Sequence, residues 1–148
     1  MALSYSVPFT TQVTLAGVID PDAYAAGTYT TGWVSMQTYT AIAALVSVGT
    51  MASTSTVDAK LQQATDGSGT GAADITAKAI TQLTEAGTDS DKQAWINLRA
   101  DELSSGFTHA RLSITVATAA SDASGHVFGL LPGYEPATDA TSVAEIVA

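Results

Sequence analysis

Apolar and polar residues alternate with a period of two along several stretches of the chain, which is the pattern of half-buried β-strands. Over residues 56–64, Val57, Ala59 and Leu61 fall on one side, and charged or amide side chains fall on the other. Over residues 109–118, four apolar residues alternate with polar ones in the same way. Each stretch therefore predicts a strand with one buried face.

Other stretches predict further strands. Strands are expected over 93–103, 72–86 and 126–131. The stretch 72–86 also carries apolar residues at helical spacing, but its threonines favour a strand. The segment 33–48 is apolar or small at most positions, which is typical of one or two strands buried on both faces. The pattern gives about seven strands.

Segments rich in glycine and aspartate separate these strands and supply turn chemistry. Turns or loops are expected at 20–22, 27–32, 66–71, 87–92 and 121–125. The sequence thus predicts an all-β fold, a single antiparallel β-sandwich or jelly-roll-like domain over residues 16–132 with extended arms at both ends.

The two ends do not fit the strand pattern. Residues 1–15 alternate but are interrupted by a proline, which lacks a backbone donor, so we expect an N-terminal edge strand or arm. Residues 133–148 follow a proline-rich break and have no clear place in the sheet, so we expect a C-terminal arm. Aromatic residues and prolines in such arms would serve to bind a partner, so the candidate interface residues there are Tyr5, Pro8, Phe9, Tyr134 and Pro136.

Trp95 is a further candidate interface residue. It falls on the side of its strand opposite Ala94, Ile96 and Leu98. It is therefore either buried in a core that covers both faces, which is the favoured interpretation, or exposed as an interface anchor.

The composition indicates a chain that works in contact with others. Charged residues make up 13% of the chain, about half the usual share of roughly 25%, while hydrophobic residues make up 46%. A weakly charged surface is expected where partners cover it, although a net charge of −9 could also keep a monomer soluble. The five basic residues are scattered, so neither nucleic acid nor an anionic membrane surface is an expected partner.

Candidate sites for chemistry are weak. The chain has no cysteine, which excludes disulfides and thiolate chemistry. Residues 67–72 match a dinucleotide-binding glycine pattern with Asp91 further on, but no helix is expected after them, so a glycine-rich turn explains them. The same loop places Asp66 and three other oxygen-bearing side chains at alternate positions, but Ala77 stands where a calcium loop needs an acid.

The two histidines, His109 and His126, each stand alone in a strand and lack the spacing of a zinc site. No G-x-S-x-G motif accompanies the many serines. We therefore expect no catalytic residue, no cofactor, no metal and no enzymatic activity. A hydrolase that depends on one of the histidines is the least favoured alternative.

Three blocks of the sequence resemble small virion proteins of tailed phages. These blocks are 57–72, 33–36, and the set 99–103, 106–107 and 111–116, within a similarity that spans about residues 30–135. The resemblance implies a β-sandwich subunit of the particle, a capsid decoration (cement) protein bound to the lattice of the major capsid protein. It also implies a homo-oligomer, for which a trimer is one expected form, on the capsid exterior after synthesis in the host cytoplasm. It assigns no functional residue.

Two other functions stay open at this point. A head–tail connector or tail subunit is the nearest alternative, because the resemblance does not separate head from tail. A carbohydrate-binding β-sandwich for host attachment is the second alternative.

Overall fold

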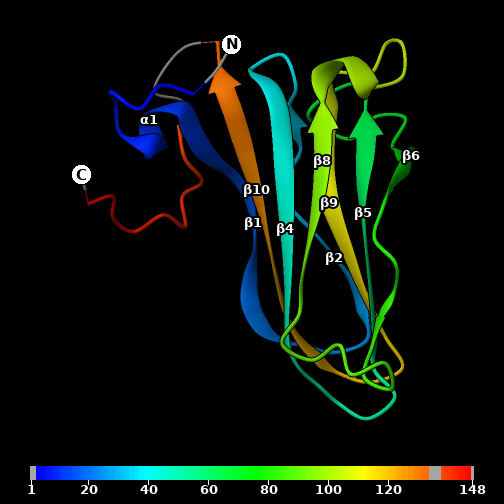
Figure 1. Ribbon diagram of the computed structural model, residues 1–148. Helices are drawn as coiled ribbons and strands as arrows, with labels where there is room; N and C mark the ends of the chain where they lie inside the picture. The colour runs from blue at the N-terminus through cyan, green and yellow to red at the C-terminus, as the bar shows by residue number, and fades with distance from the viewer. Residues whose placement is uncertain (1–2, 134–137, 148) are drawn as a thin grey trace.

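Two antiparallel sheets pack face to face in the computed structural model, which describes residues 3–133 and 138–147 (Figure 1). The elements are α1 (Phe9–Gln12), β1 (Val13–Tyr24), β2 (Gly27–Thr30), β3 (Val34–Ser35), β4 (Tyr39–Met51), β5 (Thr56–Ala64), β6 (Ala73–Ala79), β7 (Leu83–Thr84), β8 (Gln93–Arg99), η1 (Ala100–Glu102), β9 (His109–Ala117) and β10 (Ser121–Pro132). The first sheet has the order β1-β10-β4-β8, and the second has the order β2-β9-β5-β6, with β3 beside β9 and β7 beside β5. The predicted all-β sandwich is confirmed.

The strand order is that of a jelly roll. Apart from the two-residue strands β3 and β7, eight strands remain, and the first pairs with the last, the second with the seventh, the third with the sixth and the fourth with the fifth. In the structure these pairs are β1 with β10, β2 with β9, β4 with β8 and β5 with β6. Rolling four such antiparallel pairs into two layers gives this double-sheet arrangement.

Strands with strict alternation were predicted closely. The strand over 56–64 is β5, and that over 109–118 is β9, which ends at Ala117. The ambiguous stretch 72–86 forms β6 and β7, so the choice of strand over helix is confirmed. The strand over 93–103 ends at Arg99, and the 3₁₀ turn η1 follows it.

Three predicted turns or loops are wrong. The loop expected at 27–32 contains β2. The turn expected at 121–125 lies inside β10, because the chain reverses direction before it, where Thr118 takes a φ of +68°. The turn expected at 20–22 lies inside β1, with a bulge between Ile19 and Asp22. Because β1 is an edge strand, Pro21 can lack a donor there without breaking the sheet.

The N-terminal segment is not a strand before Val13. Pro8 precedes the single helical turn α1, and the side chain of Gln12 folds back to donate to the carbonyl of Ser4 at 2.6 Å and to accept from its N–H. The C-terminal residues 138–147 lie beside α1 and β1 without forming a strand (Figure 1).

The core lies between the two sheets and consists of their inward-facing apolar residues. Its most completely buried large side chains are Ile42, Val46, Val57, Leu61, Leu98, Leu112, Ile114, Val116 and Val127. Two glycines of β10 make room for core side chains, Gly125 for a residue of the second sheet and Gly129 for one of the neighbouring strand β4. A Cβ on Gly125 would lie 2.6 Å from Leu112, and one on Gly129 would lie 2.3 Å from the ring of Tyr39.

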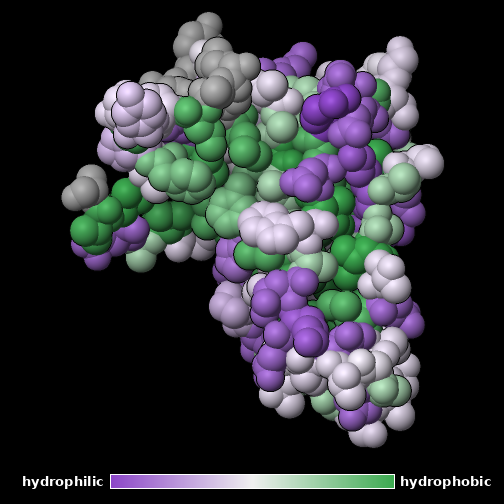
Figure 2. Space-filling view, in the orientation of Figure 1, coloured by the Kyte–Doolittle hydropathy of each residue, from purple (hydrophilic) through white to green (hydrophobic). Residues whose placement is uncertain are grey.

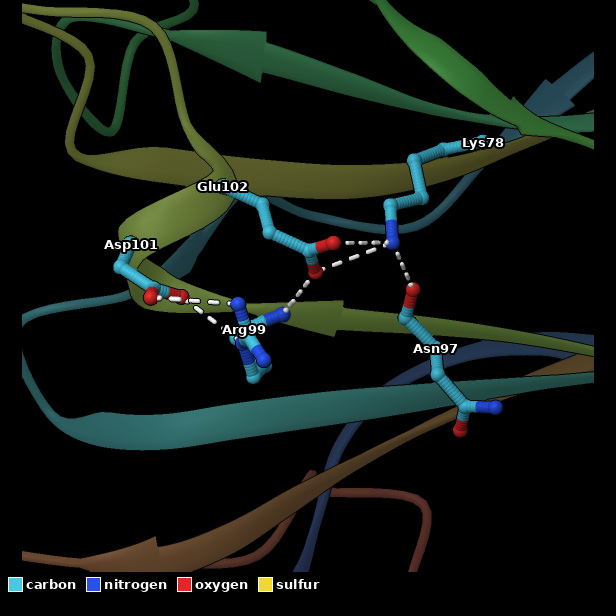
Figure 3. Close-up of polar contacts among 5 residues, drawn as sticks. All are labelled: Lys78, Asn97, Arg99, Asp101 and Glu102. Atoms are coloured by element: carbon cyan, nitrogen blue, oxygen red, sulfur yellow. Dashed lines mark hydrogen bonds and ion pairs between the residues drawn. The ribbon is translucent and has the colours of Figure 1, made fainter.

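A polar network joins the two sheets along one open side of the sandwich (Figure 3). Lys78 of β6 donates to both carboxylate oxygens of Glu102 at 2.9 Å and to the carbonyl of Asn97 on β8 at 2.8 Å. Glu102 also accepts from the backbone N–H of Arg99 at 2.8 Å. These bonds lower the pKa of the Glu102 carboxyl; the bond from the Arg99 N–H has the larger effect, and the bond from Lys78 has the next largest. The network therefore fastens β6 of the second sheet to β8 of the first.

A candidate interaction surface

The outward side of the first sheet carries a broad apolar area over β1, β10 and β4, although a sheet face that meets water is normally polar. Along β4, Ile42, Ala44 and Val46 are buried in the core, and the residues between them, such as Ala43 and Leu45, point outward and are only half-buried. The strand is thus apolar on both sides but covered on one. This corrects the expectation that the segment 33–48 is buried on both faces.

The register of the strands brings the outward apolar residues together. Phe128 of β10 pairs with Leu15 of β1 and with Ala43 of β4, and Leu45 pairs with Trp95 of β8. We call the resulting surface the apolar face; it consists of Val13, Leu15, Val18, Ala41, Ala43, Leu45, Trp95, Phe128 and Leu130. Figure 2 views the molecule from this side, where a green area extends over β10 and β4 toward the terminal segments.

A hollow of about 210 Å³ lies in the apolar face. Its lining is wholly apolar and consists of Phe9, Val13, Ala43, Trp95, Phe128 and Leu130. The rings of Trp95 and Phe128 lie 6.0 Å apart, centroid to centroid. Trp95 is 57% exposed and Phe9 is 63% exposed, so large aromatic surfaces remain open to solvent at the hollow. Anchor residues of a partner occupy apolar pockets of this kind, which lose their water on binding.

The structure brings two of the candidate interface residues to this hollow, Phe9 and Trp95. The favoured core position of Trp95 is wrong, because the second sheet covers only the opposite side of β8. Tyr5 is fully exposed and Pro8 is exposed, and both lie on the segment before α1. Tyr134 and Pro136 lie outside the described residues. A role of these residues at an interface stays a prediction.

The outward side of the second sheet has the opposite character. It carries Thr28, Thr30, Asp58, Lys60, Gln62, Arg111 and Thr115. Most of these side chains bond to one another or to neighbouring polar groups. Lys60 pairs with Asp74 at 2.7 Å, and Arg111 donates to Gln62 at 3.0 Å and lies 4.4 Å from the centre of the Trp33 ring. The outward side of the second sheet is thus an ordinary solvated face, and the apolar face lies on the outward side of the first sheet.

Within the described residues 138–147, the C-terminal segment is hydrogen-bonded to β1 at Leu15, beside the apolar face. The N–H of Ala140 donates to the carbonyl of Leu15 at 2.7 Å, and the N–H of Leu15 donates to Oδ1 of Asp139 at 2.7 Å. Further on, Ile146 is 49% exposed, and a hollow of about 320 Å³ separates this segment from Phe9 and Phe128. The segment therefore protects the edge of β1 and borders the β1 margin of the apolar face, where Val13 is buried, but it does not reach the hollow beside Trp95.

His126 lies on the same side of the sheet, between Val18 and Leu45 in register, with its ring stacked beside Phe128 at 6.4 Å. Its Nδ1 is buried and has no hydrogen-bond partner among the residues that the structure describes. His109 lies on β9 in the other sheet, where its Nδ1 is 2.8 Å from the hydroxyl of Thr108. The two histidines therefore do not converge on a common site.

The glycine-rich segment 66–71 is the turn between β5 and β6. Oδ1 of Asp66 accepts from the N–H of Ser68 at 2.9 Å and from that of Thr70 at 3.1 Å, and bonds from the side chain and backbone of Thr70 lower the pKa of this carboxyl. A strand follows the turn, not the helix that a dinucleotide site requires. Within residues 3–133 and 138–147, no three His, Asp or Glu side chains group closely enough to hold a metal ion.

Sequence reasoning missed most of the apolar face, including Leu15, Phe128 and Leu130. One signal was present, since apolar residues fill every position from 41 to 46 and therefore both sides of β4.

Among the described residues, no helix is both long enough and apolar enough to cross a membrane.

No protein-family model matches the chain, and no curated protein matches it. Among solved structures, a chain in the structure of infectious bursal disease virus Gx strain is similar over 82% of this chain, with 14% identity and a TM-score of 0.47. A chain in the structure of the Gt strain is similar over 81%, with 13% identity and a TM-score of 0.43. This chain spans 31% and 35% of those two chains. Likenesses this low do not establish a shared function.

Proposed function

We propose that this chain is a non-enzymatic structural subunit of a virus particle, which acts by binding other protein chains through the apolar face. The observation that carries the proposal is the apolar outward side of the first sheet, with Trp95 and Phe9 more than half exposed beside an apolar hollow. Burying such a surface is favourable by roughly 25 cal/mol for each Å² removed from water. Contiguous exposed apolar surface of this kind marks interaction sites.

Two further features support a role in a virion. The blocks that resemble small phage virion proteins fall on the framework of the sandwich: block 57–72 covers β5 and its turn, and block 111–116 lies in β9. The jelly-roll order is also common in viral capsid domains, although it occurs in lectins and other proteins as well. Fold alone does not determine function, so the surface is the stronger support.

The more specific form of the proposal is a decoration protein on the exterior of a phage capsid, made in the host cytoplasm and bound to the lattice of the major capsid protein. A protein that binds only the assembled shell stabilises that shell by mass action. The terminal segment with Tyr5 and Pro8, and the polar side of the second sheet, are further exposed surfaces available for contact with the capsid.

The test is the thermal rupture of particles prepared with and without this protein. We expect particles that lack it to release their nucleic acid at a lower temperature, and we expect added purified protein to restore the higher temperature. Equal rupture temperatures would overturn the decoration role. A count of copies in each particle separates the alternatives. A connector or tail subunit is present in the copy number of one ring or a few rings, whereas the copy number of a decoration protein grows with the number of subunits in the capsid lattice.

Carbohydrate binding is a second candidate, favoured by the setting of Trp95. Its exposed indole lies on the same side of β8 as Gln93, Asn97 and Arg99, and sugars bind to exposed aromatic rings flanked by polar side chains. A glycan array with wild-type protein and Trp95→Ala tests this directly. Binding of a defined glycan that the variant loses would favour it, and an array without any signal would remove it.

A further inference from the structure

We infer that a second copy of this chain covers the apolar face, in a twofold dimer in which β10 of each copy lies over β4 of the other. This inference rests on the proposed function, because it names one partner of the same surface. It is argued from the charge of the chain, from the sizes of the outward side chains, and from the charges at the two margins of the face.

The distribution of charge favours a second copy. The chain has 14 acidic and 5 basic residues, so two copies repel each other over most of their surfaces. The outward residues of β4 from Ala41 to Ser47, of β8, and of β10 from Ser124 to Leu130 include no acid. An acidic chain can therefore meet its own copy here without placing carboxylates against each other.

The outward side chains are complementary in size under one particular symmetry. Leu130 pairs in register with Ala41, and Phe128 pairs with Ala43, so these two rows hold a large residue on β10 and a small one on β4. A twofold axis parallel to the strands, between β10 and β4, keeps the rows aligned and exchanges the two strands. In these two rows each large side chain then meets a small one of the other copy, and in the next row His126 lies opposite Leu45. A twofold axis across the strands would instead place β10 on β10.

The same axis brings opposite charges together at the margins. It places β8 of one copy over β1 of the other, because these strands are the two edges of the sheet. Arg99 lies in the row of Ala41, Leu130 and Val13, and Glu145 lines the hollow beside Val13. Arg99 already pairs with Asp101 at 2.9 Å, but both side chains are about 70% exposed, and such pairs exchange partners at little cost.

Sedimentation of the purified full-length chain over a range of concentrations tests whether the dimer forms. We expect a reversible dimer for the wild type and at least about a hundredfold weaker association for Ala43→Lys. The reason is that the interface would bury two unpaired lysine charges, one from each copy. Thr30→Lys is the matched control, since it makes the same change in net charge on the outward side of the second sheet and should still dimerise. Both lysines reduce the net negative charge, so general repulsion cannot explain a loss of association.

A charge exchange tests the orientation. Arg99→Glu should weaken the dimer about tenfold, and Arg99→Glu combined with Glu145→Arg should restore it. The two residues lie at opposite margins of the same chain, so the rescue would have to act between copies. Unchanged association in Arg99→Glu, or no rescue in the double variant, would overturn this arrangement.

A wild-type chain that stays monomeric at high concentration, or an Ala43→Lys variant that dimerises normally, would overturn the dimer itself. The outcome is separable from that of the proposed function. A monomer that still raises the rupture temperature of particles removes the dimer alone, and a dimer that leaves the rupture temperature unchanged removes the decoration role alone.

Discussion

Gly129 leaves the space in which the ring of Tyr39 packs between the sheets. A Cβ at this position would lie 2.3 Å from that ring, well inside van der Waals contact, and both residues are buried. Gly129→Ala should therefore destabilise the protein by about 1–3 kcal/mol, the usual cost of overpacking. Denaturant unfolding measures it, with Gly32→Ala as the control, because a Cβ on Gly32 meets no atom within 4 Å. Equal stability of the two variants would contradict this packing.

Leu61 illustrates what alternation alone can predict for a residue. Its position in β5 placed it on the same side as Val57 and Ala59, and all three are buried. Trp95 shows the limit of the same reasoning. Alternation correctly separated it from Ile96 and Leu98, but whether its own side is covered depends on what packs there, and strand periodicity carries no information about that.

The link between β6 and β8 gives a pH-dependent prediction. The pKa of Glu102 is lower in the folded protein, so its carboxylate stabilises the fold at neutral pH. That contribution is lost as the pH falls from the unfolded-state pKa through the lower folded-state pKa. Glu102→Gln should therefore have a lower thermal midpoint than wild type at about pH 7, and the gap should close at about pH 3. A gap that is the same at both pH values would contradict the role of the charge.

The hold of the C-terminal segment on β1 should weaken when one of its two hydrogen bonds to Leu15 is removed. Asp139→Ala deletes the acceptor of the Leu15 N–H, which should then exchange its hydrogen with solvent several-fold faster. Asp139→Asn keeps a carbonyl oxygen at this position and should retain most of the protection. Hydrogen exchange followed at the Leu15 amide distinguishes the two variants. Unchanged exchange in Asp139→Ala would show that the contact does not hold the segment.

The elements that sequence could predict are those with one buried side and clear turn residues. For β5 and β9 both conditions hold, and their bounds were found almost to the residue. The start of β10 was missed because its small polar residues from Ser121 resemble a turn, while in the sheet they pair with β1 and β4. In β1, the Asp-Pro-Asp sequence resembles a turn, but it lies in the strand because the bulged edge position that accepts proline is set by the neighbouring strand.

At the scale of the whole molecule, the sandwich class was predictable, but its strand order was not. The jelly-roll order depends on pairing between strands that lie far apart in the chain, such as β1 with β10. The apolar face depends on the same pairing, because Leu15, Ala43 and Phe128 become neighbours only through the register. Phe9 and Trp95 could be chosen singly from the sequence, and the structure adds that both line one hollow.

Oxidative footprinting of the protein inside assembled particles tests most directly whether the apolar face is covered. Hydroxyl radicals modify exposed aromatic side chains, and Trp95 lies on the apolar face while Trp33 lies at the second sheet beside Arg111. Compared with the dilute isolated chain, the oxidation rate of Trp95 should fall several-fold in particles, and that of Trp33 should change much less. Equal oxidation of Trp95 in the isolated and assembled protein would contradict the account.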